Sequence, residues 1–144
     1  VELGASRLVP ILTRHTQVAR VNLERMRANA IEAAEQCGVL AVPDVAEPVA
    51  FSALAFGPER LVVFCDEAAD VADPVAALRA ATNASMPPVA VVIGPEGGFT
   101  EEERSQLLRA PSVVRLALGP RILRADTAAV AALTVVQAVL GDWR

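Results

Sequence analysis

The sequence predicts an α/β fold with a mostly parallel sheet and helices on both of its faces. Three observations indicate this class. Strand-like and helix-like segments alternate along the chain, as they do in folds built from βα units. The apolar fraction is 53% in 144 residues, which suits a single domain with a real core. Finally, glycine-containing loops follow two of the expected strands, where α/β sheets commonly bind ligands.

The first half of the chain is expected to contain one strand, one helix and a long connection. The opening residues 1–4 resemble the end of a helix, so an upstream part of the domain is expected to be missing. Residues Arg7–Leu12 are typical of a strand and Asn22–Cys37 of a helix. Residues 38–58 carry three prolines and are expected to form a connection with one helical turn at Phe51–Phe56.

The second half alternates between strands and helices. The expected strands are Arg60–Cys65, Val89–Ile93 and Val113–Leu118, and the expected helices are Pro74–Ala81, Glu101–Arg109 and Asp126–Leu140. Residues 82–88 are expected to form a loop. The last helix is apolar on nearly every side, so we expect the sheet to cover one side and a second copy of the chain to cover the other. The alternative is a helix sunk in the core of a monomer.

A glycine-rich turn links the strand at Val89–Ile93 to the next helix. Pro95 fixes one φ angle of this turn. Positive φ angles and close approach of a ligand are permitted at three glycines, Gly94, Gly97 and Gly98. Thr100 and Glu103 match a capping box for the following helix. The turn is either one wall of a ligand site or a plain βα connection, and it has neither the lysine of a Walker loop nor the GxGxxG spacing.

A second loop, Leu118–Ala128, also follows a strand, so the two loops are expected to form one pocket. Arg121 and Arg124 bring positive charge to it. Asp126 brings a carboxylate to a helix N-terminus, where the alternative role is that of a cap alone. Thr127 is suited either to capping or to a hydroxyl contact with a ligand.

Charge, cysteine content and segment lengths argue against several function classes. The net charge of −4 and the pI near 5.0 are the reverse of a basic nucleic-acid-binding surface, so RNA affinity must be local or supplied elsewhere. Cys37 and Cys65 are isolated, so we expect reduced thiols and no metal site. His15 is the only histidine, which disfavours a Ser-His-Asp hydrolase. No segment is typical of a membrane span or a signal peptide, so we expect a cytoplasmic protein without a membrane partner.

Two segments together resemble the motifs of a known family. IGPEGGFTEEE at 93–103 and LGPRILRADTA at 118–128 are similar to those of the family that methylates N3 of a uridine in bacterial 16S ribosomal RNA, within the SPOUT methyltransferases. Weaker matches lie at ELG 2–4, LVP 8–10, Arg25 and EAAEQ 32–36. The resemblance therefore covers essentially the whole chain.

This resemblance implies a SPOUT-type fold with a deep C-terminal trefoil knot, S-adenosylmethionine as cofactor, no metal, and a homodimer that binds 16S ribosomal RNA of the small subunit. It also implies a PUA-like RNA-binding barrel upstream of residues 1–144. The cofactor would lie against three loops, and the residues implied are Phe64, Cys65, Ile93, Gly94, Pro95, Glu96, Gly97, Gly98, Leu118, Gly119, Ile122 and Leu123. Backbone amides and carbonyls at these glycine-rich loops would hold it.

The chemistry of uracil methylation suggests a catalytic pair. N3 of uracil is a poor nucleophile until it loses its proton, after which negative charge spreads onto O2 and O4. We expect Arg124 to stabilise this charge, and Asp126 to orient the arginine or relay the proton. Glu96 is a competing carboxylate, which we expect to hold its loop by accepting backbone hydrogen bonds.

The chain departs from the family pattern in three places. The family usually has Thr-Glu at the position of Ala125–Asp126 and an arginine at that of Val39, and Arg-Ser is common near His15–Thr16. Two alternatives therefore stay open. One is a related SPOUT enzyme that methylates a ribose 2′-hydroxyl or another base, and the other is a catalytically silent RNA-binding or assembly factor.

Overall fold

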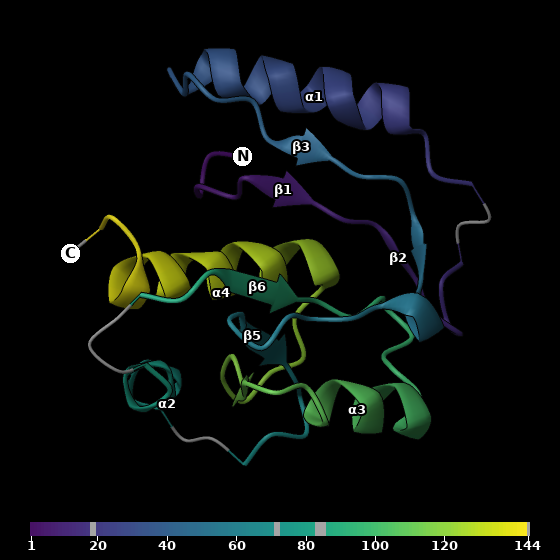
Figure 1. Ribbon diagram of the computed structural model, residues 1–144, viewed down its shortest axis with the longest axis vertical. Helices are drawn as coiled ribbons and strands as arrows, with labels where there is room; N and C mark the ends of the chain where they lie inside the picture. The colour runs from purple at the N-terminus through teal and green to yellow at the C-terminus, as the bar shows by residue number, and fades with distance from the viewer. Residues whose placement is uncertain (18–19, 71–72, 83–85, 144) are drawn as a thin grey trace. The chain divides into compact units, whose positions relative to one another are not determined.

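The computed structural model describes residues 1–17, 20–70, 73–82 and 86–143. By contacts the chain divides into two compact units, Val1–Leu54 and Ala55–Arg144. Parallel strand pairs and α-helices occur in both units, which confirms the predicted α/β class (Figure 1). The expected loop at residues 82–88 falls partly outside the described residues. Within the described ranges, no helix is long and apolar enough to cross a bilayer.

The first unit is built from two short parallel strand pairs and one helix. Its strands are β1 (Arg7–Leu8), β2 (Ile11–Leu12), β3 (Asp44–Val45) and β4 (Val49–Ala50). β1 pairs with β3, and β2 pairs with β4. Helix α1 (Leu23–Gln36) is capped by Asn22, whose side-chain oxygen accepts the Arg25 N–H at 3.0 Å. This helix buries Ala30 and Ala34.

Two predictions in this unit were wrong in part. The strand expected over Arg7–Leu12 is two strands separated by Val9 and Pro10. Pro10 has no N–H to donate to a ladder, although its carbonyl accepts the Val49 N–H at 2.9 Å. The connection expected at 38–58 contains β3 and β4, whose two-residue lengths leave no readable periodicity. The helical turn is present as η1 (Phe51–Ala53), shorter than expected.

The second unit is a regular βα alternation. Its elements are β5 (Leu61–Cys65), α2 (Pro74–Ala80), β6 (Val89–Val92), α3 (Glu101–Leu108), β7 (Val113–Leu116) and α4 (Ala125–Leu140). The strands form one parallel sheet in the order β6-β5-β7, with Val62 paired to Ala90 on one side and to Val113 on the other. β7 ends two residues earlier than predicted, so Leu118 belongs to the following loop. The carboxyl ends of all three strands lie at the same edge of the sheet.

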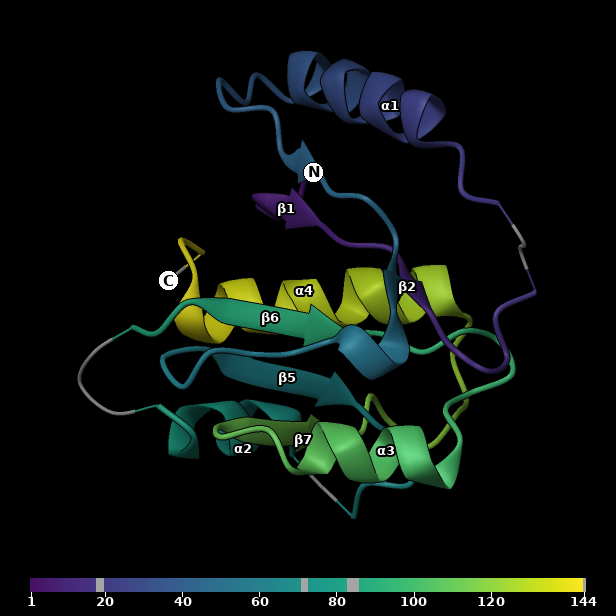
Figure 2. The same cartoon turned by 45° about the vertical axis from the view of Figure 1, so that its right-hand side comes forward.

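Helices cover both faces of this sheet (Figure 2). Leu61 and Val63 of β5 pack with apolar residues of α2, β7 and α4, namely Leu78, Val114, Leu116, Val136 and Leu140. Because side chains alternate along a strand, Phe64 points to the opposite face. There its ring meets that of Phe99 edge-on, with 5.6 Å between centroids. Phe99 comes just before α3, and α3 therefore lies on the face of the sheet opposite to α2 and α4.

Helix α4 is partly buried within this unit. Ala132, Val136 and Leu140 are buried, whereas the side of the helix that carries Val130 is open, with Val130 56% exposed. The second unit by itself therefore leaves one side of α4 uncovered.

Candidate functional site

A cleft of about 530 Å³ lies at the carboxyl edge of the second unit's sheet. Its walls come from the loops after β5, β6 and β7, which is where parallel α/β sheets place ligand sites. The twelve residues predicted to contact a cofactor all line it: Phe64, Cys65, Ile93, Gly94, Pro95, Glu96, Gly97, Gly98, Leu118, Gly119, Ile122 and Leu123. The structure therefore brings these residues together, and their contacts with a ligand remain predictions.

The glycine turn is held by its own backbone and by the helix that follows. The Gly98 N–H donates to the Pro95 carbonyl at 2.9 Å. The predicted capping box is confirmed, because Thr100 Oγ1 accepts the Glu103 N–H at 3.2 Å and Glu103 Oε2 accepts the Thr100 N–H at 2.9 Å. These bonds fix the start of α3 and hence the end of the turn.

The three glycines of this turn do different things. Positive φ is permitted at all three, but of the three only Gly98 has it, with a φ of +68°. A Cβ on Gly94 would lie 3.0 Å from Cε2 of Phe99, so this glycine makes room for an aromatic ring of the protein itself. The Phe99 ring contacts the ring of Phe64, and Phe64 also lines the cleft. Gly94 thus lines the cleft and leaves room for Phe99 to pack against Phe64.

The second loop carries the more extreme backbone angle. Gly119 has a φ of +99°, which non-glycine residues rarely adopt, and a Cβ there would meet nothing within 4 Å. The side chain of Ile122, three residues later, is 83% exposed at the cleft. The loop therefore offers bare backbone and an open apolar side chain to the same cavity.

The predicted catalytic residues lie beside the cleft and not on its wall. Arg124 is the N-cap residue of α4 and makes no side-chain cap bond, although its neighbours Leu123 and Ala125 line the cleft. Asp126 is in the first turn of α4, so its alternative assignment as the cap was wrong. Its Oδ1 accepts the Thr127 N–H at 2.8 Å. Across the described residues, no ion pair joins Arg124 to Asp126. In the same part of the chain, the Glu96 carboxylate makes none of the backbone hydrogen bonds that were expected to hold the glycine turn.

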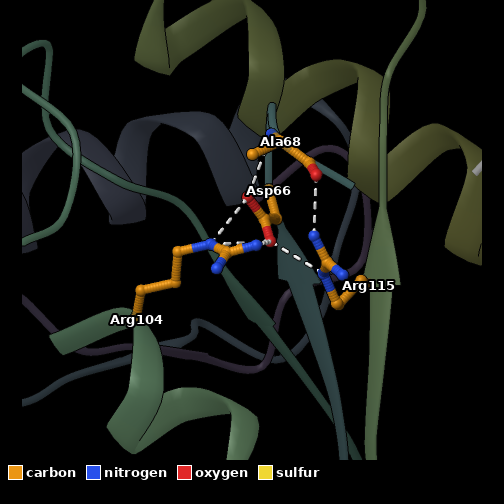
Figure 3. Close-up of polar contacts among 4 residues, drawn as sticks. All are labelled: Asp66, Ala68, Arg104 and Arg115. Carbon is orange, nitrogen blue, oxygen red and sulfur yellow. Dashed lines mark hydrogen bonds and ion pairs between the residues drawn. The ribbon is translucent and has the colours of Figure 1, made fainter. Parts of the chain in front are cut away.

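A buried carboxylate at the cleft was missed by the sequence reasoning (Figure 3). Asp66, directly after β5, is 5% exposed and forms ion pairs with Arg104 of α3 at 3.0 Å and Arg115 of β7 at 2.8 Å. Its Oδ1 also accepts the Ala68 N–H at 3.1 Å. Asp66 and Arg104 line the cleft, whereas Arg115 lies outside the lining. We call Asp66, Arg104 and Arg115 the Asp66 cluster.

Comparison with known proteins decides the family. A family model described as an RNA methyltransferase domain matches residues 1–137. The chain belongs to this family. Ribosomal RNA small subunit methyltransferase E of Rickettsia conorii is 31% identical over 136 residues, which cover 94% of this chain and 55% of that protein. The protein of the same name from Synechocystis sp. is 38% identical over 146 residues, covering 96% of this chain and 46% of that protein.

A solved relative of this RNA methyltransferase domain has the same fold. The crystal structure of a ribosomal RNA small subunit methyltransferase E from Neisseria gonorrhoeae, bound to S-adenosyl methionine, matches with a TM-score of 0.80 at 27% identity. The match covers 99% of this chain and 60% of that one. The chain spans about half the length of the curated relatives named above.

Two neighbouring side chains of the cleft, Cys65 and Asp66, differ in their ionisation. Burial raises the pKa of the Cys65 thiol to about 12, so this group stays protonated at neutral pH and is not a nucleophile. Burial also raises the pKa of Asp66, but hydrogen bonds from Arg104, Arg115 and the Ala68 amide outweigh it and bring the pKa below that of an ordinary aspartate. The Asp66 cluster is therefore ionised at neutral pH. Among the described residues, no group of His, Cys, Asp or Glu is arranged to hold a metal.

The low pKa of Asp66 predicts an acid-sensitive part of the domain's stability. The pKa of Asp66 is lowered in the folded state. The stabilisation from Asp66 is therefore complete at pH values above the pKa of an ordinary aspartate, and it is lost as the pH falls through the pKa of the folded state. Urea unfolding of wild type and Asp66→Asn should show a free-energy difference at neutral pH that shrinks below about pH 4. A difference that stays constant down to the acid limit would contradict this assignment.

Proposed function

We propose that this chain is the catalytic domain of an S-adenosylmethionine-dependent enzyme that methylates N3 of a uridine in 16S ribosomal RNA of the small subunit. The observation that carries the proposal is the single cleft formed by the three loops after β5, β6 and β7. Support also comes from relatives that carry the name ribosomal RNA small subunit methyltransferase E, one of them solved with S-adenosyl methionine.

The cleft fits a nucleoside-sized cofactor. Its volume of about 530 Å³ is in the range of small-molecule sites. Gly98 and Gly119 have no side chain, and a Cβ at either position would meet no protein atom within 4 Å. A ligand can therefore approach the main chain there. Ile93, Leu118 and Ile122 give the apolar surface that an adenine ring needs. Bound S-adenosylmethionine would supply an electrophilic methyl group on its sulfonium.

The chain's own residues would prepare the uracil for attack. N3 must give up its proton before it forms a bond to the methyl carbon, while the bond from that carbon to sulfur breaks. Arg124, exposed at the N-terminus of α4 beside the cleft, is suited to stabilise the negative charge on O2 and O4. Asp126, two residues later in the first turn of α4, would orient that arginine or take the proton, either directly or through water.

Three finer features belong to the same proposal. The loops after β6 and β7 would be part of a deep trefoil knot of the SPOUT type. The open side of α4, where Val130 is 56% exposed, would be covered by a second copy in a homodimer. The net charge of −4 is compatible with RNA binding if other parts of the protein contribute positive charge, and we expect the protein to act in the cytoplasm.

Nucleoside analysis of ribosomal RNA tests the proposal. RNA from a strain that lacks the gene should lose one 3-methyluridine of the small-subunit RNA, and the restored gene should bring it back. Loss of a 2′-O-methyl or another methylated base would support the related SPOUT enzyme instead. If no modification changes and the full-length protein fails to bind S-adenosylmethionine in calorimetry, the silent RNA-binding factor is favoured, in line with the departures at Val39 and Ala125–Asp126.

A further inference from the structure

The Asp66 cluster joins the three segments that form the cleft. Asp66 lies at the end of β5, Arg104 lies on α3 just after the glycine turn, and Arg115 lies on β7 before the second loop. Both guanidinium groups donate to the same oxygen, Oδ2, from Arg104 Nη2 at 3.0 Å and from Arg115 Nε at 2.8 Å. One buried carboxylate therefore connects all three walls (Figure 3).

The cluster also fixes the backbone of the loop after β5. Asp66 Oδ1 accepts the Ala68 N–H at 3.1 Å, and Arg115 Nη2 donates to the Ala68 carbonyl at 2.8 Å. The Asp66 carbonyl accepts the Ala69 N–H at 3.0 Å, and its own N–H donates to the Leu116 carbonyl at 3.0 Å. The conformation of residues 66–69 therefore depends on side chains from another strand.

Such a cluster is better suited to setting geometry than to adding stability. A buried ion pair gains little net free energy, because the loss of hydration offsets the attraction between the charges. Its bonds are directional, however, and a planar guanidinium fixes the distance and the angle between the segments it joins. The cluster sits where geometry matters, since Asp66 and Arg104 line the cleft itself.

We propose that Asp66, through Arg104 and Arg115, sets the spacing of the three cleft loops and is thus a positioning residue for the methyl donor. This inference rests on the proposed function for the identity of the ligand. Arg115 gives it a sharp test, because this side chain does not line the cleft. Any effect of Arg115 on ligand affinity must pass through Asp66 or the loop at Ala68.

The test is calorimetric titration of S-adenosylmethionine into the full-length protein. Asp66→Asn and Arg115→Gln should each weaken binding by about tenfold or more, as expected when charge-assisted hydrogen bonds are lost. Asp44→Asn is the matched control, since its partner Arg7 lies 3.2 Å away and both side chains are about two-thirds exposed, at 66% and 65%. We expect this control to bind like the wild type, because exposed ion pairs contribute little.

Amide hydrogen exchange without ligand separates positioning from general destabilisation. In both cluster variants, exchange should accelerate more at residues 66–69 and 93–99 than in the buried part of α4, which reports the change in global stability. Equal acceleration at the loops and in α4, or unchanged exchange at these loops, would overturn the inference. If the wild type itself does not bind S-adenosylmethionine, the proposed function fails, and the exchange result still decides whether the cluster orders the loops.

Discussion

Arg124→Ala is expected to abolish methyl transfer while leaving S-adenosylmethionine binding nearly unchanged. Removal of one preorganised group that stabilises developing negative charge typically costs about 100-fold or more in turnover. The fold should tolerate the change, because Arg124 is exposed and makes no side-chain cap bond at the start of α4. Single-turnover transfer of a labelled methyl group to ribosomal RNA gives the rate, and calorimetry gives the affinity for the cofactor.

The control for this variant is Arg79→Ala. Arg79 is exposed in the last turn of α2, so its loss removes one positive charge of the same kind away from the cleft. Turnover of this control should stay close to that of the wild type. If Arg124→Ala also keeps wild-type turnover, the assignment of the charge-stabilising residue is wrong.

Gly119→Val should prevent normal binding of S-adenosylmethionine. The φ of +99° at Gly119 is unfavourable for any L side chain and most of all for a β-branched one, so the loop after β7 must change its path. A strain of about 1–3 kcal/mol corresponds to roughly 5- to 150-fold weaker binding if the variant relieves it by leaving the bound conformation. Calorimetry of the folded variant measures this loss directly.

Two other glycines provide matched controls for Gly119→Val. Gly38 has a φ of +65° and lies just after α1, so Gly38→Val introduces similar strain outside the cleft. Gly57 has no positive φ, and a Cβ there meets nothing within 4 Å. We expect the first control to lower stability with little change in affinity and the second to change neither. Equal loss of affinity in Gly38→Val and Gly119→Val would show that the effect is not specific to the cleft.

The parts of the fold that the sequence predicts well are those with strong local signals. The strand at Leu61–Cys65 is a continuous apolar run, and α3 begins at a capping box that can be recognised from Thr100 and Glu103 alone. The cleft was predictable because loops after parallel strands meet at one edge of a sheet. Neither β3 nor β4 was predictable, since two residues show no period and their pairing depends on strands far away in the chain.

The Asp66 cluster marks the limit of local reasoning at the site. Asp66 is 38 residues from Arg104 and 49 residues from Arg115, so no spacing in the sequence connects them. A weak signal did exist, because a carboxylate directly after a buried strand lies at the edge where ligands bind. Similarly, Asp126 follows the true N-cap by two residues, within the error of a helix start predicted from sequence.

Methyl transfer in vitro shows whether the protein methylates N3 of a uridine in the small-subunit RNA. The full-length protein would be incubated with S-adenosylmethionine carrying a labelled methyl group and with small ribosomal subunits from a strain that lacks the gene, and the RNA would then be digested to nucleosides. The label should appear in 3-methyluridine, and Arg124→Ala and Gly119→Val should fail to place it there. Label in a different nucleoside, or no transfer by wild-type protein that binds the cofactor, would contradict it.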